Sequence, residues 1–196
     1  MPSIVFVVVV TKRTLASRAL TAVIVLAAGA VLGACGGDSN SSAVDSDDVE
    51  FVQGMIPHHQ QAVEMSDLAL DGRAGATVQE LAWRIQAAQD PEIVAMRGIL
   101  SRWGIEEDEH ALHHSPDDVK KMGMLTEAQM SEMAMMSGAE FDQRWIQSMI
   151  MHHEGAVEMA EAALEGGVDE EVLAIAAGIK SVQLAEIAEL RALLNG

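Results

Sequence analysis

Two histidine pairs flanked by methionines recur in this chain, and they carry the side chains best suited to bind a metal ion. The first copy, residues 55–65, reads Met-Ile-Pro-His-His-Gln-Gln-Ala-Val-Glu-Met, and residues 149–159 read Met-Ile-Met-His-His-Glu-Gly-Ala-Val-Glu-Met. The copies differ only where Met151, Glu154 and Gly155 replace Pro57, Gln60 and Gln61. A copied core helix needs only apolar volume, whereas a copied site needs its ligand atoms. The repeat therefore favours a chemical role.

The spacing predicts which of these side chains act together. On a helix, the first methionine and both histidines of each copy stand at i, i+3 and i+4 and share a face. Imidazole nitrogen binds copper, zinc, nickel or iron, whereas thioether sulfur selects copper, above all Cu(I). We therefore predict a copper site, with zinc as an alternative. Its candidate ligands are His58, His59, His152, His153, Met55 and Met149, together with Met65 and Met159, for which core packing is the stronger explanation.

Further candidate side chains lie outside the two motifs. His110, His113 and His114 could form a second metal site with Met122 and Met124, or belong to a solvated loop. Four more methionines follow, and they are typical either of a soft-metal arm or of a lid over the bundle: Met130, Met133, Met135 and Met136. The pairs Gln89/Glu92 and Gln183/Glu186 could hold the imidazole rings or form a polar surface row.

The elements that position these residues are predicted to be helices. Apolar residues recur three and four positions apart, and matches at one constant offset extend the repeat across both halves of the chain. The sequence therefore predicts an all-α four-helix bundle of two duplicated hairpins, about 47–103 and 141–195, joined by an insert at 104–140. The substitution of Met151 for Pro57 marks a place where the two halves could differ.

Capping residues set the expected helix starts. Asp47 with Glu50 resembles a capping pair for the first helix, and Asp169 is the expected N-cap of the last. Thr126 with Gln129 resembles a capping box and predicts an insert helix over about 127–137.

Glycine and proline set the expected ends and breaks. Gly72 and the pair Gly166-Gly167 should end the first helix of each hairpin, and Gly138 should end the insert helix. Pro91 should kink or restart the second helix, because proline lacks the amide hydrogen.

Residues 1–35 resemble a bacterial lipoprotein signal peptide. Lys12, Arg13 and Arg18 precede the apolar run 19–33, and Leu32-Gly33-Ala34-Cys35 resembles a lipobox. We predict a lipid on Cys35, a flexible tether at 36–46, a domain at 47–196 and an extracytoplasmic, membrane-anchored location. The alternatives are an ordinary secretory signal or a membrane span, although the run is short for the roughly 20 residues that a span needs.

Charge and cysteine content limit the partners. The formal net charge is −18, which excludes nucleic acid because phosphate binding needs a basic surface. An anionic surface instead attracts cations. Cys35 is the only cysteine, so the domain has no internal disulfide. No feature of the sequence indicates a protein partner.

The motifs are similar to those of the family known as domain of unknown function 305. The resemblance rests on residues 149–160, on Gly138-Ala-Glu-Phe141-Asp142 and on the Met122-Gly-Met124 and Met130 region, and it covers about 47–195. It implies a ferritin-like four-helix bundle, and some members of the family are implicated in extracytoplasmic copper handling. It also implies the same His and Met ligands as above.

Three functional hypotheses follow. The first is a lipid-anchored, non-enzymatic protein that sequesters or transfers copper. The second is a structural or partner-binding helical module whose histidines are buried polar packing. The third is a ferritin-like oxidase, which needs Glu-x-x-His motifs that do not occur near the duplicated histidines.

Overall fold

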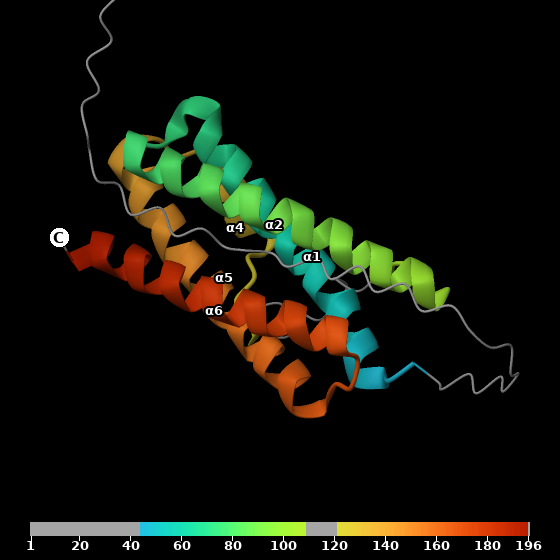
Figure 1. Ribbon diagram of the computed structural model, residues 1–196. Helices are drawn as coiled ribbons and strands as arrows, with labels where there is room; N and C mark the ends of the chain where they lie inside the picture. Colours follow the sequence, from blue (N-terminus) through green and yellow to red (C-terminus); the bar gives the residue numbers. More distant parts are fainter. Residues whose placement is uncertain (1–43, 109–120, 196) are drawn as a thin grey trace, which may run out of the picture. The chain divides into compact units, whose positions relative to one another are not determined.

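The structure, a computed structural model, describes residues 44–108 and 121–195, which belong to one compact unit. Every regular element in these ranges is a helix, as predicted (Figure 1). The first hairpin comprises α1 (Ser46–Leu68), the short π-helix η1 (Ala69–Arg73) and α2 (Ala76–Trp103). The insert contributes α4 (Glu127–Ala134), and the second hairpin comprises α5 (Gly138–Gly166) and α6 (Glu170–Asn195).

The two hairpins join through their first helices. α1 packs along α2, α5 packs along α6, and α1 also packs against α5. α1 and α5 run antiparallel, because the Trp145 indole near the start of α5 donates to the Met65 carbonyl near the end of α1, at 2.9 Å. The predicted four-helix bundle of two hairpins is confirmed.

The core consists of two apolar clusters with the histidines between them. One cluster contains Ala62 and Met65 of α1 with Trp145, Met149 and Ile150 of α5. The other contains Met55 and Ile56 of α1 with Ala156 and Ala160 of α5. Along both helices the His-His pair falls between a residue of one cluster and a residue of the other. The four histidines therefore form a polar layer across the middle of the bundle.

Two equivalent aspartates tie the ends of the hairpins together. Asp48 at the start of α1 accepts from the amides of Val168 and Asp169 at 3.1 and 2.9 Å, just before α6. Its counterpart Asp142 in α5 accepts from the amide of Gly75 at 2.9 Å, just before α2. The pseudo-twofold repeat therefore extends from the histidine motif to the hydrogen bonds that position the outer helices.

The predicted caps are partly confirmed. Asp169 accepts from the amides of Glu171 and Val172 at 2.9 and 3.1 Å, and Thr126 and Gln129 form the expected capping box. The expectation for Asp47 is wrong, because Asp45 caps α1 by accepting from the Asp47 amide at 2.9 Å.

The glycines end the helices for two different reasons. Gly72 adopts the left-handed conformation, with φ 83°, as a helix end requires. α5 ends at Gly166 as predicted, but Gly167 caps it in an extended conformation, with φ −69°. Glycine is needed at 166 and 167 because there is no room for a side chain. A Cβ on Gly166 would lie 2.1 Å from Asp47 Oδ2, and one on Gly167 would lie 2.4 Å from Asp48 Oδ1.

Two predicted boundaries are also wrong. α2 runs through Pro91 without the restart that was one of the two alternatives, because Pro91 and Ala87, whose carbonyl loses its partner, are both exposed to water. α4 ends at Ala134 rather than near 137, because the amides of Met135 and Met136 close a tight turn onto Glu132 and Met133. Gly138, with φ 63°, begins α5 instead of ending α4.

Within the described ranges no helix has both the length and the apolar composition of a membrane span. Residues 1–43, which hold the predicted signal, Cys35 and most of the tether, lie outside these ranges, as do residues 109–120 with His110, His113 and His114.

The paired aspartates provide a test of the fold. Asp48 is 1% exposed, so Asp48→Ala should strand two amide donors and lower the free energy of unfolding by about 2 kcal/mol. Asp142→Ala is the matched control, because the same change in the other half releases only one amide, and the expected loss is about 1 kcal/mol. Urea unfolding measures both. Equal losses of unfolding free energy in the two variants would show that the second amide bond of Asp48 adds no stability.

Candidate metal site

The four motif histidines meet in the interior of the bundle. His58, His59, His152 and His153 are all fully buried. The rings of His58 and His152, one from each hairpin, lie 3.8 Å apart between centroids at an angle of 42°. The rings of His152 and His153 lie 6.4 Å apart. The pseudo-twofold axis that relates the two halves therefore passes close to the His58–His152 contact.

Two carboxylates hold the outer rings from the second helix of each hairpin. His59 Nε2 donates to Glu92 on α2 at 2.8 Å, and His153 Nε2 donates to Glu186 on α6 at 2.8 Å. These bonds confirm the predicted positioning role of the two glutamates. Gln89 and Gln183 are buried, but neither amide bonds to an imidazole in the described part of the chain.

The carboxylates determine which ring nitrogen is free. Because a carboxylate only accepts, a neutral ring bonded through Nε2 carries its proton there and keeps the lone pair on Nδ1. This carboxylate–histidine arrangement is the usual support of a histidine that ligates a metal. Nδ1 of His59 and Nδ1 of His153 are both buried without a hydrogen-bond partner among the described residues.

The inner rings are held differently in the two halves. His58 Nε2 donates to the carbonyl of Met122 at 2.9 Å, again leaving Nδ1 unpaired. Neither nitrogen of His152 forms a well-aligned hydrogen bond with a described residue, although the nearby His58 backbone slightly opposes the lowering of the His152 pKa. Burying a polar atom without a partner costs about 1–3 kcal/mol. The donor set fits a metal ion, which would take up the lone pair on one nitrogen of each ring.

The non-equivalence comes from the insert. Residues 122–125, which we call the strap, cross α1 and α5 beside the inner histidines. Gln61 binds both the amide and the carbonyl of Leu125, at 2.7 and 2.8 Å. Its counterpart is Gly155, where a Cβ would lie 1.9 Å from the Met122 carbonyl oxygen. Gly123 has φ 70°, and a Cβ there would lie 2.0 Å from the Met151 carbonyl oxygen.

The halves were expected to differ at Pro57 and Met151, and they do differ, but the larger cause is the pair Gln61 and Gly155. One residue holds the strap and the other leaves space for it. Sequence reasoning missed both roles, although the mismatch was visible in the repeat. The hydrogen bond from His58 to the Met122 carbonyl could not be predicted from the sequence, because every residue has a backbone carbonyl.

Burial keeps the inner rings neutral. Removal from water lowers the pKa of His58 from 6.5 to about 3, with smaller contributions from His59 and His153. Removal from water also lowers the pKa of His152 well below its usual value, and His58 adds to the effect. A neutral imidazole is the form that ligates a metal.

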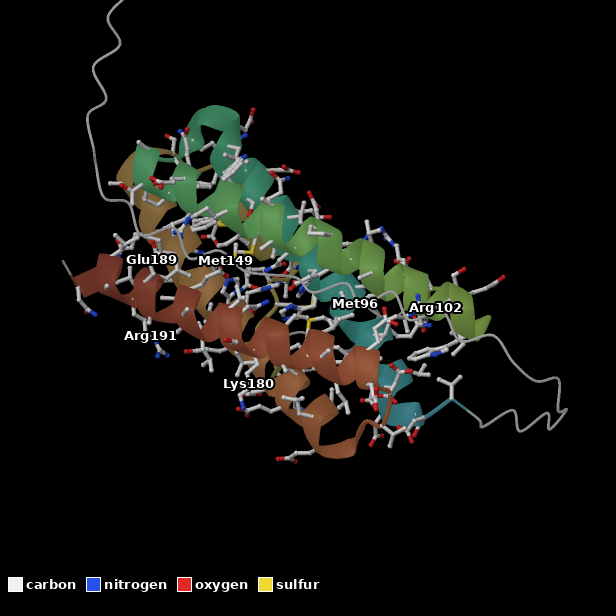
Figure 2. The ribbon with its side chains drawn as sticks, viewed as in Figure 1. Met96, Arg102, Met149, Lys180, Glu189 and Arg191 are labelled. Atoms are coloured by element: carbon white, nitrogen blue, oxygen red, sulfur yellow. The ribbon has the colours of Figure 1, made fainter. Side chains whose placement is uncertain are left out.

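The methionines fall into three environments. Met55 and Met149 are fully buried in opposite apolar clusters, one on each side of the histidine layer, and Figure 2 shows Met149 directed into the bundle. Met65 is also fully buried and belongs to the same cluster as Met149. Met159 is only half-buried and lines a surface pocket with Met122.

The insert methionines act mainly as a lid. Met124 and Met133 are buried, and Met130 and Met136 pack partly buried against the core cluster. Met135 points away and is 89% exposed. Met96 lies outside the repeated motifs, yet it is a fully buried thioether in the same cluster as Met55.

No group of three or more His, Cys, Asp or Glu side chains in residues 44–108 and 121–195 is arranged to hold a metal ion by itself. A metal site in this layer therefore needs thioether sulfur beside imidazole nitrogen, or a small rotation of the rings that brings their free nitrogens together.

Fold and site define a helical bundle of two duplicated hairpins with a buried histidine layer where they meet. The chain belongs to the family described as "Domain of unknown function (DUF305)", which it matches over residues 48–194. A search of curated proteins found no match.

Solved structures of similar proteins share the bundle. A DUF305 fragment from Deinococcus radiodurans is 31% identical, with a TM-score of 0.71 over 78% of this chain and 97% of that chain. A DUF305 protein from Streptomyces coelicolor is 31% identical, with a TM-score of 0.68 over 77% and 93%. CopM in its Cu(I)-bound form is 25% identical, with a TM-score of 0.62 over 76% and 96%.

The first prediction from this site concerns pH. The unfolded chain takes up protons on His58 and His152 near pH 6.5, whereas the folded, metal-free protein does not until the pH reaches the lowered pKa values. The contribution of each ring to stability is therefore complete above pH 6.5 and is lost as the pH falls through its lowered pKa, which for His58 is about 3.

Between pH 6.5 and 5 the free energy of unfolding should drop by roughly 1 kcal/mol per pH unit for each ring. Urea unfolding across this range measures the slope. The variant His58→Gln/His152→Gln should have a flatter profile, and an unchanged slope would contradict the assignment.

The second prediction concerns the strap. Gly155→Ala should lower the free energy of unfolding or displace the strap from His58, because its Cβ would meet the Met122 carbonyl. Gly178→Ala is the matched control, since a Cβ on that helical glycine would have nothing within 4 Å, and this variant should gain about 1 kcal/mol. Thermal unfolding compares them, and a gain in both would refute the close packing.

Proposed function

We propose that this protein is an extracytoplasmic copper carrier that holds or passes on the ion without catalysing a reaction. The observation that carries the proposal is the fully buried layer of four histidines whose Nδ1 atoms lack partners among the described residues. Met55 and Met149 flank this layer from opposite sides. Imidazole with thioether is a donor set that suits copper, and Cu(I) in particular.

The relatives support the same assignment. CopM, which is 25% identical to this chain, has been solved in a Cu(I)-bound form and in a silver-bound form, and silver shares the preference of Cu(I) for soft ligands. A copper ion of this kind is cargo, so the buried layer would act as a store or a transfer site. The negative formal charge of −18 favours the approach of cations.

The location is also part of the proposal. The lipobox-like sequence at Leu32–Cys35 supports export and a lipid anchor on Cys35. The similar protein from Streptomyces coelicolor is described as a predicted secreted protein, which agrees with a role outside the cytoplasm. Copper would then be bound at the outer face of the membrane.

The donor set favours a carrier over the two alternatives. A di-iron oxidase needs carboxylates as direct ligands together with Glu-x-x-His, whereas Glu92 and Glu186 here bond to outer imidazole nitrogens. A purely structural histidine layer would be expected to pair its buried nitrogens, because unpaired ones lower stability.

Copper binding and its selectivity test the proposal. The purified protein should bind Cu(I) with a dissociation constant below about 1 µM in competition with a chromogenic chelator, and the bound ion should raise the melting temperature. His59→Gln/His153→Gln should weaken binding by at least about tenfold, because the loss of only the hydrogen-bond partner of a ligand already costs about that much.

A paired variant separates sulfur from nitrogen ligands. Met55→Leu/Met149→Leu keeps the core volume and should weaken Cu(I) but leave Zn(II) affinity unchanged, because only copper prefers the thioether. Circular dichroism confirms that each variant is folded. Equal Cu(I) affinity in wild type and histidine variants would reject the proposal.

A further inference from the structure

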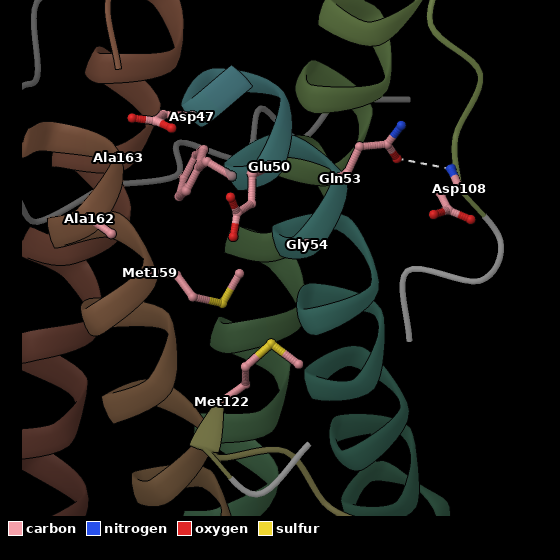
Figure 3. A pocket seen from close by; sticks show the side chains of 10 residues that line it. Asp47, Glu50, Gln53, Gly54, Asp108, Met122, Met159, Ala162 and Ala163 are labelled. Atoms are coloured by element: carbon pink, nitrogen blue, oxygen red, sulfur yellow. Dashed lines mark hydrogen bonds between the residues drawn. The ribbon is translucent and has the colours of Figure 1, made fainter. Parts of the chain in front are cut away.

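A cavity of about 550 Å³ opens at the surface between the start of α1 and the end of α5 (Figure 3). Met122 of the strap and Met159 of α5 direct their sulfur atoms into it. Glu50 and Asp47 of α1 add two exposed carboxylates. Neither side chain forms a hydrogen bond or ion pair with another described residue, so both carboxylates are available to a cation.

These donors suit one class of ligand. Two thioethers select a soft monovalent ion, Cu(I) or Ag(I), over zinc and over hard cations such as magnesium or calcium. The carboxylates supply negative charge that attracts the ion and offsets its own charge. Both methionines are half-buried, unlike the fully buried Met55 and Met149, so an ion in solvent can reach their sulfur atoms directly.

The corresponding place in the other half is closed. The five pocket residues Asp47, Glu50, Gly54, Met159 and Ala162 correspond in the repeat to Phe141, Arg144, Ser148, Met65 and Leu68. There, a cation stands in place of the Glu50 carboxylate, and larger side chains replace the small or polar ones. Met65, Phe141 and Ser148 are fully buried.

Gly54 shows how narrowly the open pocket is defined. A Cβ at this position would lie 3.1 Å from the terminal methyl of Met159. A side chain here would press on the thioether that lines the cavity. The duplication therefore produced two equivalent positions, and only one of them has kept an acidic, sulfur-lined opening.

The pocket connects directly to the histidine layer through one residue. The thioether of Met122 lines the cavity, while the carbonyl of the same residue accepts from His58 Nε2 at 2.9 Å. An ion held by the Met122 sulfur is therefore bound to the same residue whose carbonyl contacts the His58 ring. The His58 ring in turn faces His152.

We infer that this pocket is a capture site for Cu(I) or Ag(I), in which Met122 and Met159 bind the ion before it passes to the buried histidines. The inference rests on the proposed copper function and adds the route of loading and its direction. Transfer is an exchange of ligands, thioether for imidazole, and changes no oxidation state.

Three variants of the full protein test the capture site. Met122→Leu/Met159→Leu removes the sulfur atoms at nearly constant volume. Glu50→Arg/Gly54→Ser copies the closed counterpart into the open pocket. Met135→Leu, an exposed methionine outside the pocket, and Glu64→Arg, an exposed glutamate on α1, are the matched controls.

Silver nitrate in a non-coordinating buffer is the probe, because Ag(I) is stable in air. Stopped-flow tryptophan fluorescence measures the loading rate, and equilibrium titration with inductively coupled plasma analysis measures the bound equivalents. Both pocket variants should load more slowly, by roughly tenfold or more, and bind one equivalent fewer. The controls should match the wild type.

His152→Gln separates this inference from the proposed function. It should lose the buried equivalent and retain the one in the pocket, with sulfur atoms around silver in X-ray absorption spectra. If the pocket variants load and bind like the wild type while His152→Gln loses an equivalent, the capture site is overturned and the copper function stands. If His152→Gln binds like the wild type and the pocket variants do not, the buried layer is rejected and the pocket stands.

Discussion

A buried imidazole needs an acceptor for its N–H group, and much of this structure follows from how that need is met for three of the four buried rings. Glu92 and Glu186 reach His59 and His153 from the second helix of each hairpin, and the Met122 carbonyl reaches His58 from the insert. Each bond holds the ring proton on Nε2 and leaves Nδ1 with its lone pair. The packing of α1 on α2 and of α5 on α6 therefore fixes the chemistry of the rings as well as the core.

The duplication explains the symmetry of the bundle, and the insert explains where the symmetry ends. Equivalent aspartates, Asp48 and Asp142, position the outer helices, and equivalent glutamates hold equivalent histidines. The strap belongs to neither repeat and can cross the layer only once. It binds Gln61 on one side and fits against Gly155 on the other, so His58 is hydrogen-bonded and His152 is not.

The same asymmetry connects the interior to the surface. The strap supplies Met122 to both the pocket and His58, whereas the opposite half fills the corresponding space with Phe141 and Leu68. A layer of unpaired nitrogens between two apolar clusters lowers the stability of the empty protein. That loss is a common property of binding sites, because the ligand recovers it. The Cu(I)-bound and silver-bound forms of CopM, a similar protein, agree with the proposal that this ligand is a soft metal ion.

The amino-acid sequence by itself determined the helices, the two hairpins and the meeting of four histidines, because helical periodicity and an internal repeat can both be recognised in the linear sequence. It also indicated Glu92 and Glu186, since both occur at the same place in each repeat. It failed at Asp47, where Asp45 caps the helix instead, and in allowing a restart at Pro91, where water can reach the carbonyl that loses its partner. Only the tertiary structure decided the path of the strap, the closed and open halves and the bond to the Met122 carbonyl. These depend on backbone groups and on space between segments far apart in the chain, which residue types alone do not encode.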